Sequence, residues 1–449
     1  MSFEIPLTQQ ALILQADRTL AVVAVPVPKP GPGQILVQVT VGAQNPTDWK
    51  ALKDGRVNPG YGLGHDFAGR VVLLGEGVTN VAVGERVAGF VLPSRSNTMG
   101  AFREYTVVGA HPLLKIPDVV HDEEAATLPV ASTTAALGLR HIADFPRSAP
   151  LDHTILVWGG SSSVGLYAIQ LARTINLRVI ATASPHNHAL VRAHGADVVI
   201  DYHAPDVVEQ VVRATGRRGG VDYVFDAISE DESVEPASRC LKRDGPRKAA
   251  VVLVPHEKQR DPSVEYHLVI APSLLGGQTN LGSIFIPNDE RNLRFANEFY
   301  ALAADWLREG RLKANPYTVR PGGLTAIQEG LKLMQDGKVM YLRDILKPRA
   351  RIDPSPQFIH PCRGIQKIWG TGLLDPTDRP IDRLTSSIII IIIIIIIISR
   401  RICHSTAFDV HSSSIIASVT VSVEFGNQIS IKGLALSRVN TIIGVVFIR

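Results

Sequence analysis

Glycine and serine residues between a buried strand and a helix are the part of this chain that most directly indicates chemistry. Residues 155–173 read ILVWGGSSSVGLYAIQLAR. Glycines let the backbone approach a pyrophosphate, and a helix start supplies free N–H groups and the positive end of a dipole. Serine stands at position 162, where the common fingerprint has glycine, so an ordinary strand–turn–helix is the alternative. We predict that this turn binds a dinucleotide through Ser161, Ser162, Ser163, Val164 and Gly165.

The strand expected over residues 178–184 indicates which dinucleotide is bound. An NAD-specific site usually has Asp or Glu about twenty residues after the glycines, where it holds the ribose 2′-hydroxyl. Here the strand is followed by hydroxyl, imidazole and amide groups instead of a carboxylate. These groups can donate hydrogen bonds to a 2′-phosphate, whereas a carboxylate would repel it. These residues could also only cap the helix expected over 189–194. The sequence therefore favours NADPH, bound by Ser184, Pro185, His186 and Asn187.

The elements around this turn predict an α/β fold with two domains. Repeated strand–helix–strand units imply a doubly wound parallel sheet of the Rossmann type. Before them, residues 9–115 read as a β-rich domain of short strands between Pro and Gly turns. The expected strands are 11–14, 34–41, 69–74, 85–90, 222–226 and 248–254, and the expected helices include 123–140 and 291–312, the latter returning the chain to the first domain.

Composition excludes several classes of function. Charged residues make up 20% of the 449 residues and the formal net charge is only +4, with Lys and Arg scattered, so we expect no nucleic-acid partner. Three cysteines, Cys240, Cys362 and Cys403, are too few for a disulfide framework. The first residues lack the basic cap and apolar core of a signal peptide, which favours a cytoplasmic location.

Two motifs add a family resemblance. GHDFAG at 64–69, GERV at 84–87 and the order of the domains resemble the medium-chain dehydrogenase/reductase superfamily over about residues 9–340. The resemblance implies a GroES-like β-rich catalytic domain over 1–125, completed by 285–347, and a Rossmann NADPH-binding domain over 126–284. Residues 348–449 would be an atypical extension.

A zinc site is not expected. In zinc-dependent members of that superfamily, a Cys in an early loop and the His of a Gly-His-Glu segment bind the catalytic metal. Here the loop over 44–50 reads QNPTDWK and Asp66 follows His65. Zinc needs several soft or imidazole ligands around one point, so we interpret His65 as structural. Without a Lewis acid, reduction of a conjugated double bond is favoured over reduction of a ketone.

Within the zinc-free branch, segments 45–50, 132–139, and 184–187 followed by 200–202 resemble the trans-acting enoyl reductases of fungal polyketide biosynthesis. The resemblance implies a nicotinamide pocket formed by Thr47, Asp48, Trp49, Lys50, Leu253 and Val254, a 2′-phosphate contact at Tyr202, and a last NADPH contact at Val339. It also implies that the acyl substrate is bordered by Ser132, Thr133, Thr134, Ala135, Ala136, Leu137, Gly138 and Leu139, and touched by Val269, Ile270, Ala271, Pro272 and Ser273.

The implied reaction is hydride transfer to the β-carbon of an α,β-unsaturated thioester carried by a polyketide synthase, followed by protonation of the α-carbon. Lys50 is the candidate charge near the cofactor or the enolate, and Thr133 or Thr134 could donate to the thioester carbonyl. Lys50 could instead be a surface lysine, the threonines could only start a helix, and solvent could supply the proton. A zinc-free quinone or alkenal reductase and a non-catalytic NADPH-binding protein remain alternatives. The enzyme would be a monomer or a homodimer.

The carboxyl-terminal part departs from the family. Family members close with Gly-Lys-Val-Ser-Gly, whereas this chain has DGKVMYLRD at 336–344. Eleven isoleucines follow at 388–398. That run is shorter than the roughly twenty apolar residues that span a bilayer, and such homopolymers tend to aggregate as β-structure. We expect residues 348–449 to be disordered or to come from an incorrectly assigned gene structure. A membrane-associating tail is the alternative, but not a stable membrane span.

Overall fold

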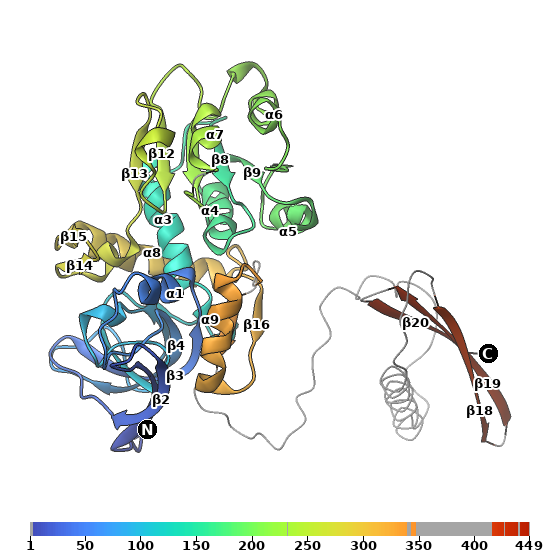
Figure 1. Ribbon diagram of the computed structural model, residues 1–449, viewed down its shortest axis with the longest axis horizontal. Helices are drawn as coiled ribbons and strands as arrows, with labels where there is room; N and C mark the ends of the chain where they lie inside the picture. Colours follow the sequence, from blue (N-terminus) through green and yellow to red (C-terminus); the bar gives the residue numbers. More distant parts are fainter. Residues whose placement is uncertain are drawn as a thin grey trace, which may run out of the picture. The chain divides into compact units, whose positions relative to one another are not determined.

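The protein is described by a computed structural model that places residues 3–230, 232–338, 343–346, 415–425, 427–438 and 441–448, with side chains up to residue 338. The chain divides into two compact units, Met1–Ser355 and Pro356–Arg449. Two sheets of different type form the framework of the first unit (Figure 1).

The first sheet is mostly antiparallel and forms the predicted GroES-like domain. Its order is β16-β17-β3-β4-β5-β7, and β6 also pairs with β3. Gly69 lets two of its strands approach closely, because a Cβ at Gly69 would lie 2.2 Å from the carbonyl oxygen of Gln38. A separate antiparallel pair, β1 and β2, accompanies the sheet. The strands are β1 (Thr8–Leu14), β2 (Leu20–Pro26), β3 (Gln34–Ala43), β4 (Asp66–Leu74), β5 (Arg86–Phe90), β6 (Tyr105–Gly109), β7 (Leu114–Lys115), β16 (Tyr317–Val319) and β17 (Arg343–Leu346).

The second sheet is entirely parallel, in the order β10-β9-β8-β11-β12-β13. The chain runs outward from β8 to β10 and then returns to the other side of β8 with β11. The order thus reverses between β8 and β11, where open α/β sheets bind ligands at the carboxyl ends of their strands. The predicted Rossmann arrangement is confirmed. Its strands are β8 (Thr154–Trp158), β9 (Arg178–Thr182), β10 (Val198–Ile200), β11 (Tyr223–Asp226), β12 (Lys248–Val251) and β13 (Glu265–Leu268).

Helices connect the parallel strands and link the two sheets. Helix α3 (Pro129–Ala143) packs against α4, β11 and β12, and α8 (Glu290–Arg308) contacts both α3 and β7 (Figure 1). The chain thus returns to the first sheet after the Rossmann strands, as predicted. The remaining helices are α1 (Pro46–Lys53), α2 (Asp122–Ala126), α4 (Ser163–Thr174), α5 (His188–Ala193), α6 (Val207–Ala214), α7 (Val234–Arg239) and α9 (Ile327–Gln335).

Three predicted elements were wrong in extent. The helix expected over 123–140 is two helices, α2 and α3, because Pro129 has no N–H with which to continue the hydrogen bonding of α2 and instead begins α3. The strand expected over 248–254 ends at Val251, and Val254 lies in an exposed loop. The helix expected over 291–312 ends at Arg308, four residues before Leu312 turns back into the core.

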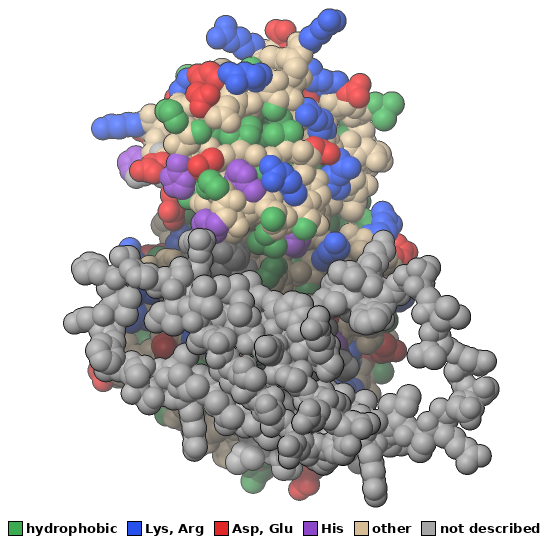
Figure 2. Space-filling view, turned by 90° about the vertical axis from the view of Figure 1, so that its right-hand side faces the viewer, with side chains coloured by type: hydrophobic (Ala, Val, Ile, Leu, Met, Phe, Trp, Pro, Cys, Tyr) green, Lys and Arg blue, Asp and Glu red, His purple; other side chains and the backbone are tan. Residues whose placement is uncertain are grey.

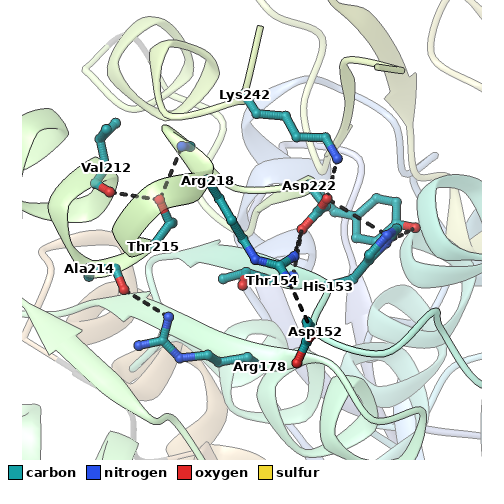
Figure 3. Close-up of polar contacts among 12 residues, drawn as sticks. Asp152, His153, Thr154, Arg178, Val212, Ala214, Thr215, Arg218, Asp222 and Lys242 are labelled. Carbon is teal, nitrogen blue, oxygen red and sulfur yellow. Dashed lines mark hydrogen bonds and ion pairs between the residues drawn. The ribbon is translucent and has the colours of Figure 1, made fainter. Parts of the chain in front are cut away.

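A polar cluster around Asp222 ties the amino-terminal ends of β8 and β11 together (Figure 3). The buried Asp222 carboxylate accepts hydrogen bonds from the Thr154 N–H at 2.8 Å and the Lys242 ammonium at 2.5 Å. Arg218 lies 3.7 Å from the same carboxylate and also pairs with the exposed Asp152. Burial opposes ionisation, but the hydrogen bonds from Lys242 and the Thr154 N–H, together with the nearby positive charges, outweigh it and hold the pKa of Asp222 below its ordinary value. The cluster lies at the sheet edge opposite the predicted cofactor edge.

The remaining described elements are two small antiparallel sheets. One is the hairpin β14 (Thr279–Leu281) and β15 (Ile284–Ile286). The other, which the sequence did not predict, belongs to the second unit and consists of β18 (Ile415–Phe425), β19 (Asn427–Arg438) and β20 (Thr441–Ile448). The isoleucines at 388–398 lie outside the described residues. Among the helices that are described, none is long and apolar enough to cross a membrane. On the part of the surface that Figure 2 colours by side-chain type, basic and acidic side chains are interspersed.

Candidate functional site

Gly159 and Gly165 bring the end of β8 and the start of α4 into direct contact. Gly159 has a φ of 74°, in the left-handed region that favours glycine. A Cβ on Gly165 would lie 2.3 Å from the Gly159 carbonyl oxygen. The last glycine of a dinucleotide fingerprint has this same role in helix–strand packing. The turn therefore places the first N–H groups of α4 at the carboxyl edge of the sheet.

Ser162 caps α4, as its Oγ accepts a hydrogen bond from the Gly165 N–H at 3.0 Å. Ser161, Ser163 and Val164 are half-buried in the same turn. The buried Asn315 donates from Nδ2 to the Ser163 Oγ at 2.7 Å and thus fixes the helix start. The first-turn N–H groups of a helix have no partner within the helix, so these residues fit a phosphate group.

Ser184 and Tyr202 meet beyond the ends of β9 and β10. The Ser184 Oγ donates to the Tyr202 hydroxyl at 3.3 Å, and Tyr202 is 41% exposed. The His203 ring lies 4.0 Å from the Tyr202 ring, centroid to centroid. Pro185, His186 and the buried Asn187 form a short 3-10 turn directly before α5. Asn187 occupies the cap position of α5, but its side chain makes no capping hydrogen bond there.

The loop that resembles a zinc-ligand segment forms a buried hydrogen-bond network. The His65 Nδ1 lies 2.5 Å from the Asp48 Oδ1, and the Asp48 Oδ2 accepts from the Asn45 N–H at 2.7 Å. The Asn45 Nδ2 donates to the Asp66 Oδ2 at 3.0 Å, and the Asp66 Oδ1 accepts from the Val130 N–H at 2.8 Å. Within the described residues, no group of three or more His, Cys, Asp or Glu side chains could hold a metal ion.

Helix α1 carries the four residues that the resemblance places beside the nicotinamide. Asp48 belongs to the buried network, whereas Thr47, Trp49 and Lys50 are half-buried. The Lys50 Nζ lies 3.3 Å from the Glu230 Oε1, in the loop after β11, and 5.6 Å from the centroid of the Trp49 ring. Lys50 is therefore not an isolated surface lysine but connects the GroES-like domain to the Rossmann domain.

The loop after β11, which contacts Lys50 through Glu230, was not predicted from the sequence as part of the site. The buried Asp226 accepts hydrogen bonds from the N–H groups of Ile228 and Ser229 at 2.9 and 2.8 Å, and from the Ser233 hydroxyl at 2.7 Å. Burial raises the pKa of Asp226 above its ordinary value. The position of Asp226 at the end of a buried strand was the only sign of this loop in the sequence. Its hydrogen-bond partners follow only from the conformation of the loop.

The three hydroxyl residues near the start of α3 are buried and differ in their hydrogen bonds. The Thr133 hydroxyl donates to the Pro129 carbonyl at 2.5 Å, and the Thr134 hydroxyl donates to the Val130 carbonyl at 2.6 Å. Each hydroxyl has a single proton, so donation to a substrate would require rotation away from the helix backbone. Within the described residues, the Ser132 Oγ has no hydrogen-bond partner.

The other residues expected near the substrate lie deeper. A Cβ on Gly138 would lie 2.4 Å from the Phe225 ring, which shows how closely α3 packs on β11. Ala135, Ala136, Leu137 and Leu139 are at most 1% exposed and belong to the core between α3 and the sheet. In the segment after β13, Val269 and Ala271 are buried, and Ile270, Pro272 and Ser273 are half-buried.

Two predicted nicotinamide contacts follow β12. Leu253 is half-buried and Val254 is 64% exposed. The Val252 N–H donates to the Ser229 hydroxyl at 2.8 Å, so this segment is fixed to the loop after β11. Val339, the last predicted contact, lies outside the described residues.

Comparisons with known proteins agree with this arrangement. Residues 31–118 match the model of the alcohol dehydrogenase GroES-like domain, and residues 163–298 match that of the zinc-binding dehydrogenase family. The fold is similar to that of the enoyl reductase CurK, with a TM-score of 0.61 at 19% identity over 76% of this chain and 99% of that one.

Among curated proteins, the chain is 31% identical to a trans-enoyl reductase of Alternaria alternata over 76% of its own length and 99% of the relative's. It is 33% identical to a trans-enoyl reductase of Gibberella zeae, covering 75% and 96%. It is 30% identical to the enoyl reductase component of the lovastatin nonaketide synthase of Aspergillus terreus, covering 75% and 95%. The chain therefore belongs to the medium-chain dehydrogenase/reductase superfamily of oxidoreductases, in which fungal trans-enoyl reductases are its relatives.

Proposed function

We propose that the protein is an NADPH-dependent enoyl reductase that acts in trans on an α,β-unsaturated acyl thioester carried by a polyketide synthase. The similarity to trans-enoyl reductases supports the reaction class. The observation that carries the cofactor site is the position of the turn from Gly159 to Gly165, at the reversal point of the parallel sheet. NADPH is favoured over NADH because Ser184 and Tyr202, rather than a carboxylate, stand where the 2′-phosphate would lie.

When bound, NADPH supplies the hydride that the β-carbon of the enoyl thioester accepts. The turn from Gly159 to Gly165 would hold the pyrophosphate, and the α1 residues Thr47 to Lys50 would lie beside the nicotinamide. The Lys50 ammonium provides a positive charge that stabilises the developing enolate. Proton delivery to the α-carbon is assigned to solvent, because Thr133 and Thr134 already donate to backbone carbonyls.

We propose further that the reaction needs no zinc. Asn45 provides an amide in the loop where zinc-dependent members have a thiolate, and within the described part of the chain no group of three His, Cys, Asp or Glu side chains surrounds one point. An enolate forms from an enoyl thioester without a metal if a positive charge is near its oxygen. The buried free thiol of Cys240 fits a reducing cytoplasm, where the protein would act as a monomer or homodimer.

The test is NADPH oxidation by the purified full chain, presented in parallel with a crotonyl thioester of N-acetylcysteamine and with a small free quinone. Turnover of the thioester alone supports the proposal. Turnover of the quinone alone assigns the protein to the general quinone reductases instead. Binding of NADPH without turnover of either compound would identify a non-catalytic NADPH-binding protein.

The cofactor assignment has its own test. Tyr202→Phe and Ser184→Ala should each weaken NADPH binding about two- to tenfold, since each removes a donor to a charged phosphate. Binding of NADH should not change. Equal affinity of the unsubstituted protein for NADH and NADPH would contradict the assignment.

A further inference from the structure

The ion pair between Lys50 and Glu230 joins two domains at the predicted cofactor site. Lys50 lies on α1 of the GroES-like domain, and Glu230 lies in the loop between β11 and α7 of the Rossmann domain. Their charged atoms are 3.3 Å apart, with the lysine side chain 27% exposed and the glutamate side chain 65% exposed. The pair thus connects the segment predicted to lie beside the nicotinamide with the carboxyl edge of the parallel sheet.

The backbone on the glutamate side is firmly held. Asp226 accepts from two N–H groups of the loop and from the Ser233 hydroxyl, and the Glu230 carbonyl accepts from the Ser233 N–H at 2.9 Å. The Ser229 hydroxyl donates to the Asp226 carbonyl at 2.9 Å and accepts from the Val252 N–H. These bonds hold the backbone from Asp226 to Glu230 and so define the position from which the Glu230 side chain extends.

The same loop lies against the dinucleotide turn. A Cβ on Gly159 would be only 2.5 Å from the Ile228 Cγ1. Ile228 therefore packs directly on the turn, two residues before Glu230. A shift of the cofactor turn, of the β11 loop or of α1 would change the distance between the Lys50 and Glu230 charges.

We propose that Glu230 is a positioning residue that fixes the Lys50 ammonium at the nicotinamide end of the site. This inference rests on the proposed function, because it assigns Lys50 to the cofactor or the enolate. Trp49 bounds one side of the ammonium and Glu230 bounds another, so the charge is held near the reacting atoms without direct contact between Glu230 and the substrate. Because the pair is partly exposed, its loss should change the rate of hydride transfer by a factor of only about two to five.

The chain offers a matched control. Glu232 is an exposed carboxylate two residues further along, and among the described residues it makes no hydrogen bond or ion pair. Glu230→Gln should slow single-turnover hydride transfer from NADPH to a crotonyl thioester about two- to fivefold. Glu232→Gln, which removes the same charge, should leave the rate unchanged. The apparent melting temperature should be equal in both variants.

A double-mutant cycle shows whether Glu230 acts through Lys50. If it does, Lys50→Met and the double variant Lys50→Met/Glu230→Gln should have equal hydride-transfer rates. If the two substitutions slow the reaction independently, so that their effects multiply, Glu230 does not act through Lys50 and the proposal is overturned.

A second readout separates this inference from the proposed function. Lys50 can be modified with acetic anhydride at pH 8 and quantified by peptide mass spectrometry, without cofactor or substrate. An ion-paired ammonium should react more slowly, so Lys50 should be acetylated faster in Glu230→Gln than in Glu232→Gln or the unsubstituted protein. Equal acetylation in all three proteins overturns the positioning role, whether or not the thioester is turned over. Absence of turnover together with faster acetylation would overturn only the proposed function.

Discussion

The imidazole of His65 and the carboxylate of Asp48 are joined by a buried hydrogen bond of 2.5 Å between Nδ1 and Oδ1. The same carboxylate also accepts from the Asn45 N–H. His65, which stands where zinc-dependent members have a metal-binding His, is thus hydrogen-bonded to a carboxylate in this chain. Their interaction fixes the start of α1 against β4, and so fixes the position of Lys50 on that helix.

The first prediction is that this network stabilises the protein without a metal. His65→Ala should lower the free energy of unfolding by about 1–3 kcal/mol, because it leaves a buried acceptor on Asp48 without its partner. Urea unfolding measures this loss. Exhaustive dialysis against a chelator should change neither the unfolding midpoint nor enoyl reduction. One zinc ion per purified chain, lost together with activity in His65→Ala, would contradict the prediction.

The second prediction concerns the dinucleotide turn. Gly165→Ala should weaken dinucleotide binding by at least about tenfold and lower stability by about 1–3 kcal/mol, because the added Cβ cannot fit 2.3 Å from the Gly159 carbonyl oxygen. Ser161→Ala is the control for the loss of stability, since it changes the same turn without placing an atom between β8 and α4. Isothermal titration with NADPH and thermal unfolding measure both effects. Unchanged binding in Gly165→Ala would remove the turn from the cofactor site.

Asp222 provides a prediction about pH. Its folded-state pKa is lowered, so the carboxylate contributes stability above its unfolded-state pKa of about 4, and this contribution is lost as the pH falls through the folded-state value. Asp222→Asn should therefore lower the free energy of unfolding by about 1–3 kcal/mol at pH 7, and by progressively less below about pH 4. Asp152 is an 83% exposed partner of the same Arg218. Asp152→Asn should therefore change the free energy of unfolding little, both at pH 7 and below pH 4. An Asp222→Asn effect that is independent of pH would disprove this ionic role.

Cys240 should be chemically inert in the folded protein. Burial raises the pKa of its thiol to about 12, so almost no thiolate forms at pH 8. The thiol also donates to the Pro236 carbonyl at 3.2 Å. Alkylation with iodoacetamide, followed by peptide mapping, should find Cys240 unmodified in the native protein and modified in urea. Equal modification in both states would show that this part of the Rossmann domain opens in solution.

The two-domain architecture could be predicted because its signals are local. The strand, the glycine turn and the helix at 155–173 lie within one continuous segment, and the confirmed strand positions follow from short apolar runs between Pro and Gly. The break between α2 and α3 was also visible in principle, because a proline can begin a helix but cannot continue the hydrogen bonding of a preceding one. The strand over 248–254 was predicted too long because apolar residues continue into a loop.

The connections within the site could not be predicted from spacing. Glu230 lies 180 residues from Lys50, and Asn315 lies 152 residues from Ser163, so only the fold brings these residues together. Nor does the sequence show that the Thr133 and Thr134 hydroxyls donate to their own helix, since the same residues at a helix start could equally face a ligand. The NADPH, thioester and site-residue assignments remain predictions.

The most direct test of the central claim follows the hydride. NADPH that carries deuterium at the transferred position of C4 is incubated with the purified full chain and a crotonyl thioester, and the product is examined by NMR. We predict one deuterium at the β-carbon of the saturated thioester, with hydrogen from solvent at the α-carbon. Deuterium at the α-carbon, or unchanged crotonyl thioester under conditions in which the protein reduces a quinone, would contradict the assignment as an enoyl reductase.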